Sequence, residues 1–145
     1  MGTLAIRRAA NAEGAQPVRK IGPDLAVEQA FRTPTVFRPF AAAVASVGTP
    51  VVAWTPATGQ RFRLMGWSYT AGGTGAAVFK EASVAVSVGS LWTNPAGAAN
   101  VVVNSPPGLV NGILAASRNN PLVIDSTVAG ITYTGTIFGA EEAGD

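Results

Sequence analysis

The chain has 145 residues, which suits one domain with an extended segment, and its 17 glycines and 10 prolines are too many for a helical bundle. Hydrophobic residues make up 48% of the chain, whereas charged residues make up only 12%, about half the usual share of a soluble domain. A surface so poor in charge indicates that much of it contacts other protein. The chain contains no Cys and no His, which excludes zinc fingers, thiol catalysis and histidine general bases.

The charges are distributed unevenly along the chain. Residues 1–40 carry six cations and three acids, whereas residues 41–145 carry four cations and five acids. This asymmetry is typical of a basic arm attached to a near-neutral body. No apolar run approaches the roughly 20 residues of a membrane-spanning helix, and no apolar stretch follows Arg7 and Arg8 as in a signal peptide. We therefore expect a protein made in the cytoplasm, without a membrane partner.

Residues 1–42 are predicted to form an extended arm with at most one short helix. The one candidate helix begins at Asp24, which can cap its N-terminus, and ends at about Arg32. Each proline of this segment disfavours a helix interior or a central strand. These prolines are Pro17, Pro23, Pro34 and Pro39.

The arm also carries apolar side chains that a solvated leader, the alternative interpretation, does not need. Its cations, offset by three acids across residues 1–40, are too dilute for a nucleic-acid-binding patch, so no nucleic-acid partner is expected. We predict instead that the arm docks onto another protein. The predicted binding residues are its cations and phenylalanines: Arg7, Arg8, Arg19, Lys20, Phe31, Arg32, Phe37, Arg38 and Phe40.

The patterns in residues 43–145 predict a mainly β domain, an antiparallel β-sandwich or barrel-like fold of seven or eight short strands. Residues 71–75 are rich in glycine and predict a loop, and residues 109–116 fit either a turn of helix or a strand. Taken in chain order, the β-prone runs are 50–54, 61–64, 78–80, 84–88, 101–103, 122–125 and 131–137.

Two details of these runs predict local geometry. Gly66 follows a clearly alternating run and indicates a bulge or a close approach of backbone. The last run alternates, and a ladder of threonines is typical of an outward or laterally packed strand face. Its apolar face carries Ile131, Tyr133 and Ile137, and its other face carries Thr132, Thr134 and Thr136.

Catalytic groups are scarce in this chain. Glu81 and Asp125 are the one candidate carboxylate pair for glycoside hydrolysis, but nothing in the sequence brings them together, and Asp125-Ser126-Thr127 fits a turn or a loop cap. Residues 71–75 lack the Lys and the following helix of a phosphate-binding loop. We therefore expect no enzyme activity, no metal site and no cofactor.

Large aromatic residues could supply a sugar-stacking platform in a β-sandwich binding module. Trp54 and Trp67 lie within apolar runs, so we predict that both belong to the core. Trp92 precedes Thr93-Asn94-Pro95 at the end of a run and is predicted to be the most exposed. The full set of candidates is Trp54, Trp67, Tyr69, Trp92 and Tyr133.

Several segments of the body resemble a known family in style and in order. They are residues 49–64 (TPVVAWTPATGQRFRL), 111–116 (NGILAA) and 119–124 (NNPLVI), and a Thr-rich final run that ends Gly139-Ala140-Glu141-Glu142. Over about two thirds of the chain, this sequence resembles small structural proteins of tailed bacteriophages, especially capsid decoration (cement) proteins. The resemblance implies an extended arm, a compact β domain and a homotrimer on the outer surface of the capsid, in contact with the major capsid protein.

The expected function is therefore structural: decoration and stabilisation of a phage capsid through the arm and an oligomeric β domain. The protein would be made in the host cytoplasm and would reside in the virion. The alternative is another virion component, a tail or head–tail protein, with a receptor- or glycan-binding β domain. The number of copies in each particle distinguishes the two.

Overall fold

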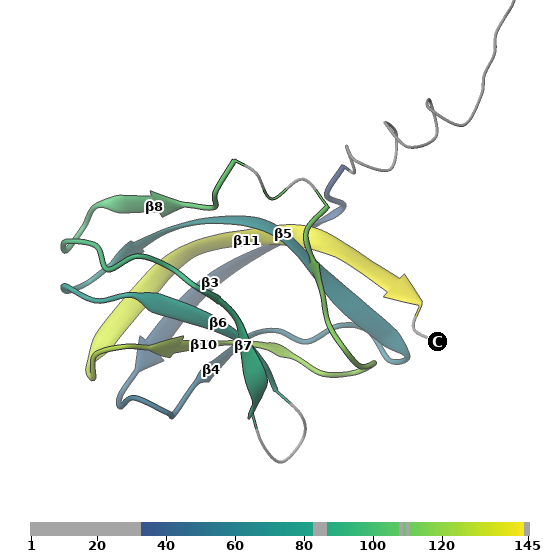
Figure 1. The fold of residues 1–145 in the computed structure, drawn as a ribbon, viewed down its shortest axis with the longest axis horizontal. Coiled ribbons are helices and arrows are strands. Elements are labelled where there is room, and N and C mark those ends of the chain that lie inside the picture. Colours follow the sequence, from purple (N-terminus) through teal and green to yellow (C-terminus); the bar gives the residue numbers. More distant parts are fainter. Residues whose placement is uncertain (1–32, 83–86, 108, 110, 144–145) are drawn as a thin grey trace, which may run out of the picture. The chain divides into compact units, whose positions relative to one another are not determined.

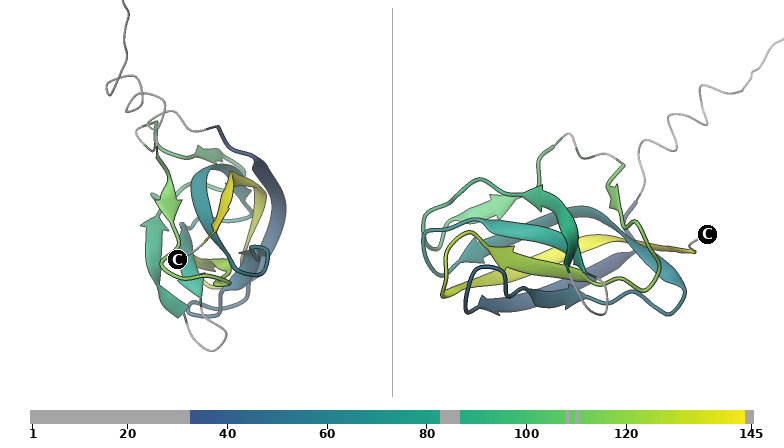
Figure 2. Two further views of the ribbon diagram at one scale, coloured as in Figure 1. Left: turned by 90° about the vertical axis from the view of Figure 1, so that its right-hand side faces the viewer. Right: turned by 60° about the horizontal axis from the view of Figure 1, so that its bottom comes forward.

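The computed structural model describes residues 33–82, 87–107, 109 and 111–143 as two antiparallel β-sheets packed face to face (Figure 1, Figure 2). This confirms the predicted mainly β, sandwich-like class. The strands are β3 (Val36–Val44), β4 (Val51–Trp54), β5 (Gln60–Ala71), β6 (Ala77–Ala82), β7 (Ser87–Thr93), β8 (Val102–Asn104), β9 (Ile113–Leu114), β10 (Leu122–Ser126) and β11 (Ile131–Ala143).

The strand order defines the topology. One sheet has the order β4-β10-β6-β7, and the other has the order β3-β11-β5-β8, with β9 also paired to β5. Most successive strands alternate between the two sheets, and these two orders are those of a jelly roll. The two sheets are called here the four-stranded and the five-stranded sheet.

The core lies between the sheets and is dominated by aromatic side chains. Trp67 packs on Phe79 with ring centroids 4.7 Å apart, and Tyr69 meets Tyr133 edge to face at 5.6 Å. Such pairs add to the free energy gained by burying their area. The largest fully buried side chains are Trp54, Trp67, Tyr69, Tyr133, Phe62, Phe79, Leu64, Leu122, Ile124 and Ile137.

The alternation predicted for the final run is confirmed in β11. Ile131, Tyr133 and Ile137 are buried, whereas Thr132 and Thr134 are exposed. Successive side chains of a strand point to opposite faces, so the threonines lie on the outer face of the five-stranded sheet.

The irregularity predicted at Gly66 is also confirmed. Phe138 of β11 pairs with Gly66, but the next residue of β11, Gly139, pairs with Leu64, so Met65 is an extra residue in β5. The phenyl ring of Phe138 lies where a side chain of residue 66 would project. Both the bulge and the close approach are therefore present.

The start of the first strand differs from the prediction. Residues 36–42, assigned to the arm, belong to β3, where Val36 to Val44 pair with Gly139 to Ile131 of β11. Pro39 argued against a strand there, but β3 is the edge of its sheet, and an edge strand tolerates a residue without an N–H.

Two further segments, residues 109–116 and 84–88, were predicted from the sequence. The undecided segment 109–116 contains β9, which pairs with Arg63 and Leu64 of β5. The predicted run 84–88 lies partly outside the described residues, which resume with β7 at Ser87.

Candidate protein-interaction surface

Most of the predicted arm residues cannot be placed. Arg7, Arg8, Arg19, Lys20, Phe31 and Arg32 lie outside the described residues, whereas Phe37, Arg38 and Phe40 lie on β3. Phe40 is half-buried and packs against the core of its own domain. Arg38 approaches Glu141, with Nη2 3.9 Å from Oε2. Phe37 is therefore the predicted binding residue that presents most of its ring, 61% exposed, to the surroundings.

Phe37 does not project alone. Its ring centroid is 6.2 Å from that of Phe138 on the neighbouring strand, and Phe138 in turn covers Gly66. The glycine leaves room for the Phe138 ring, and the two rings are tilted by 33° to one another. We call Phe37 and Phe138 the aromatic knob.

The knob stands at one end of a face that carries no charge. Alternate residues of β3, β11, β5 and β8 point away from the core. The face that they form runs from the bulge at Met65 to the loops at the other end of the sheet, next to Val44. Of the described residues on this face, none is Asp, Glu, Lys or Arg. Most of them are exposed or half-exposed. This outer face consists of Phe37, Pro39, Ala41, Ala43, Gly66, Ser68, Thr70, Val102, Asn104, Thr132, Thr134, Thr136 and Phe138.

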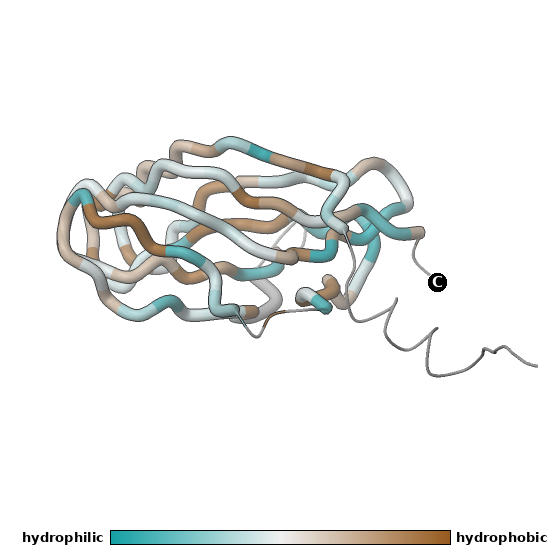
Figure 3. The backbone as a smooth tube through the Cα atoms, turned by 90° about the horizontal axis from the view of Figure 1, so that it is seen from above, coloured by the Kyte–Doolittle hydropathy of each residue, from teal (hydrophilic) through white to brown (hydrophobic). Residues whose placement is uncertain are grey.

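Charged residues occur beyond the bulge, and the tube of Figure 3 has the hydrophilic colour near the end of β11. There Arg63 donates from Nε and Nη2 to the carboxylate of Glu142. Glu141 accepts a 2.9 Å hydrogen bond from the indole Nε1 of Trp54 and another from the N–H of Ala57. Glu141 joins the end of β11 to β4, whereas Arg63 and Glu142 pair on the outer side of the five-stranded sheet, where they form a charged rim that bounds the uncharged outer face.

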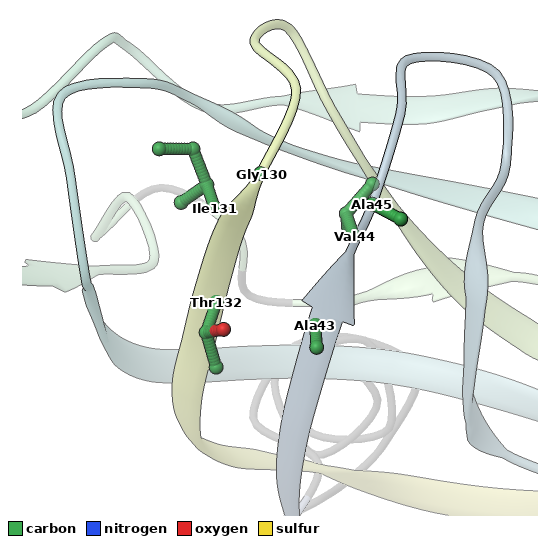
Figure 4. A pocket seen from close by; sticks show the side chains of 6 residues that line it. All are labelled: Ala43, Val44, Ala45, Gly130, Ile131 and Thr132. Atoms are coloured by element: carbon green, nitrogen blue, oxygen red, sulfur yellow. The ribbon is translucent and has the colours of Figure 1, made fainter.

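At the opposite end of the outer face lies a small hollow (Figure 4). Ala43 and Thr132, which pair directly across β3 and β11, line it together with Val44, Ala45, Gly130 and Ile131. Its cavity volume is about 130 Å³, and its lining is mainly apolar. Cavities of roughly 150 Å³ with apolar walls accept a benzene ring, so the hollow has the scale of one aromatic side chain.

The candidate carboxylate pair does not meet. Glu81 pairs with Leu122 and points to the core side, where it accepts hydrogen bonds from the N–H groups of Ala116 and Ser117. Asp125 pairs with Val78 and points to the other side of the same sheet. Each carboxylate therefore holds a loop or a neighbouring strand in place.

Asp125 is buried and bound to a cation, Lys80. It is 2% exposed, and it accepts hydrogen bonds from Lys80 Nζ at 2.6 Å and from the N–H of Gly48 at 3.0 Å. Burial opposes its ionisation, but the hydrogen bonds from Lys80, Ser126 and Gly48 outweigh burial and lower its pKa. Asp125 and Ser126 thus belong to β10 rather than to the predicted local turn, and the loop that Asp125 caps is the distant β3–β4 loop.

The aromatic platform is not exposed. Trp54, Trp67, Tyr69 and Tyr133 are all buried, which confirms the prediction for the two tryptophans. Trp92 is half-buried and packs against Trp67 in a tilted geometry, with ring centroids 6.0 Å apart, so it too contributes to packing. The four buried rings are therefore not free to stack on a sugar, and Trp92 exposes only part of its surface.

Sequence reasoning missed the knob and the hollow. The signal for the outer face, the threonine ladder of β11, was visible in the sequence. The contact of Phe37 with Phe138 and the pairing of Ala43 with Thr132 were not, because each joins segments that are far apart along the chain.

In the part of the chain that the structure describes, no helix has the length and apolar character to cross a membrane. The same residues contain no cluster of side chains suited to a metal ion. Comparisons with protein-family models, with curated proteins and with solved structures return no match.

Proposed function

We propose that this protein is a structural virion component that decorates and stabilises a phage capsid. In this proposal the oligomeric β domain sits on the outer surface of the capsid, and the N-terminal arm bridges subunits of the major capsid protein. The proposal includes self-association, for which the sequence resemblance implies a homotrimer.

The observation that carries the proposal is the uncharged outer face of the five-stranded sheet. A free monomer ordinarily covers such a face with charged residues, which keep it soluble and separate from its neighbours. Here the face carries small residues, hydroxyl groups and an aromatic knob in which Phe37 is 61% exposed. A face of this composition suits protein contact, which fits the low charge content of 12%.

The jelly-roll connectivity agrees with the proposal at the level of fold. Viral capsid domains use this topology, and lectins and cupins use it too, so the topology alone does not select a function. The burial of Trp54, Trp67, Tyr69 and Tyr133 places four of the five candidate sugar-stacking rings in the core. The structural role is therefore favoured over the glycan-binding alternative.

The arm supplies the mechanism of attachment. Burying one phenylalanine contributes about 1.5–3 kcal/mol, whereas an exposed ion pair contributes about 0–1 kcal/mol. Phe31 is therefore expected to set the affinity of the arm, and its cations are expected to guide docking and to make it salt-sensitive. Ordering the arm opposes binding by roughly 1–2 kcal/mol per residue, so several arms on one oligomer must act together.

The copy number of the protein in purified virions tests the proposal. Quantitative mass spectrometry should find it in amounts comparable with the major capsid protein. A small ring of copies would instead assign it to the tail or to the head–tail connection, and its absence from virions would refute both assignments.

A further inference from the structure

We infer that the outer face of the five-stranded sheet binds the same face of a second copy of this chain, with the exposed Phe37 ring of each copy's aromatic knob in the hollow of the other. This contact deepens the self-association included in the proposed function. It needs no capsid, so it can be tested on the purified protein alone.

The positions of the knob and the hollow support a reciprocal contact. Phe37 and Ala43 lie on the same strand and on the same side of it, six residues apart, and Phe138 and Thr132 mark the same two ends on β11. A two-fold axis in the plane of the interface, perpendicular to the strands, exchanges these ends. Two copies related by such an axis therefore place each knob against the partner's hollow.

The chemistry of the face suits a copy of itself. It carries no described charge, so pairing buries no unpaired ion and brings no like charges together. Its polar groups are mainly hydroxyls, on Ser68, Thr70, Thr132, Thr134 and Thr136, and a hydroxyl both donates and accepts hydrogen bonds. A strongly acidic or basic partner would find no complementary charge here.

The area of the outer face indicates whether it binds one further copy, in a two-fold pair, or two further copies, in a ring of three. At about 3.4 Å per residue, the nine residues of β3 span roughly 30 Å, and four strands about 4.8 Å apart span roughly 19 Å. One face therefore offers at most about 570 Å², and a pair buries roughly 1,100 Å² in total, near the lower limit of about 1,200 Å² for specific complexes.

A ring of three would divide the same face between two neighbours. Each contact would then bury only about 570 Å² in total, which is the size of incidental contacts between molecules. The face therefore favours a two-fold pair, and a homotrimer would have to form through other surfaces. The inference also assigns Phe37 to the contact between copies rather than to the capsid.

The test is sedimentation equilibrium of the full chain over a range of concentrations. We expect concentration-dependent two-fold pairing, from monomer to dimer, or from trimer to hexamer where the implied homotrimer also forms through other surfaces. Phe37→Ser removes the Phe37 ring of each copy, and therefore two rings from each reciprocal contact. Because the loss of one such ring weakens the affinity roughly tenfold, this variant should weaken dimerisation about a hundredfold. Thr134→Lys, near the middle of the face, should also prevent pairing because it brings two cations together.

Val52→Ser is the matched control. Val52 is 57% exposed, close to the exposure of Phe37, but it lies on the four-stranded sheet. This variant should dimerise like the unaltered chain. A monomer at every concentration, a trimer that does not pair at any concentration, or a Phe37→Ser variant that dimerises as tightly as the Val52→Ser control would each overturn the inference.

Cross-linking gives a second readout, because the chain contains no cysteine. Thr134→Cys places a thiol near the midpoint of the face, where the two copies meet, and a short bis-maleimide should join it into covalent dimers. Val52→Cys should remain monomeric under the same treatment. Equal cross-linking of the two variants would contradict the arrangement. Because neither experiment contains a capsid, their failure leaves the proposed decoration to be judged by copy number.

Discussion

Phe138 lies directly over the backbone of Gly66, so closely that its ring occupies the place of a side chain at residue 66. The bulge at Met65 sets these two residues opposite one another. A glycine in a strand interior ordinarily weakens the strand, and the ring of a cross-strand aromatic residue compensates by covering it. This contact supports the aromatic knob and makes residue 66 sensitive to substitution.

Gly66→Ala should therefore destabilise the domain by about 1–3 kcal/mol, because the added methyl group displaces the Phe138 ring. Urea denaturation followed by tryptophan fluorescence measures the change. Gly72→Ala is the control, because the methyl group that it adds would lie 3.4 Å from the nearest atom, the carbonyl oxygen of Thr132, which is an ordinary contact distance. Because the two substitutions act on the same contact, Gly66→Ala should hardly change the free energy of unfolding of a chain that already carries Phe138→Ala. An unchanged cost there would reject the steric explanation.

Asp125→Asn should reduce the free energy of unfolding at neutral pH by about 1.5–3 kcal/mol, because it removes the charged hydrogen bond with Lys80. The pKa of Asp125 is lower in the folded chain than its ordinary value of 3.8, so the unfolded chain binds the proton more readily. Its contribution is present above pH 3.8 and is lost as the pH falls through the folded value.

The difference between the unaltered chain and the Asp125→Asn variant should therefore shrink in acid. Urea denaturation at a series of pH values measures this difference. If the difference in free energy of unfolding between the two proteins stays constant from neutral pH into strong acid, the ionised carboxylate contributes nothing to stability.

Both tyrosines should resist ionisation in the folded protein. Burial raises the pKa of Tyr69 from 10.0 to about 12, and burial also raises the pKa of Tyr133, whose hydroxyl is 2.7 Å from that of Ser126. The unfolded chain loses these protons first, so stability should fall as the pH rises above 10. Ultraviolet absorbance during an alkaline titration measures phenolate, with the urea-unfolded chain as control. Phenolate that forms at pH 10 while the fold persists would contradict the buried positions.

The structure also fixes where the arm can be cut. A chain that starts at Thr33 keeps all of β3 and should unfold at nearly the temperature of the full chain. A chain that starts at Ala41 loses the pairing of Val36–Phe40 with Gly135–Gly139. It should be clearly less stable, because the edge of β11 and part of the core beneath Phe40 become exposed. Thermal unfolding followed by circular dichroism compares the two chains.

The sequence predicted the elements in which local pattern and tertiary environment agree. The alternation of Ile131 to Ile137 gave the correct faces of β11, and Gly66 correctly indicated the bulge. Asn119 has a positive φ of 65°, a conformation that asparagine adopts more readily than most residues, in the turn before Pro121. Each of these features is encoded within a few residues, so no knowledge of the fold was needed.

The remaining features depend on contacts between distant segments. Nothing local distinguishes β3 as an edge strand that tolerates Pro39, and the order of strands in each sheet is set by packing between the sheets. The aromatic knob and the hollow arise only when β3 and β11 lie side by side. For this reason the sequence placed Phe37 in an arm, whereas the structure places it on the outer face of a sheet.

The central claim is that the protein binds a capsid through its arm. Its most direct test is a co-sedimentation isotherm with phage capsids that lack this protein, measured for the full chain and for the chain that starts at Thr33. The proposal predicts saturable binding of the full chain and loss of most binding after truncation, while the truncated domain stays folded. Equal binding by both chains would place the contact in the β domain, and no saturable binding of the full chain would contradict the claim.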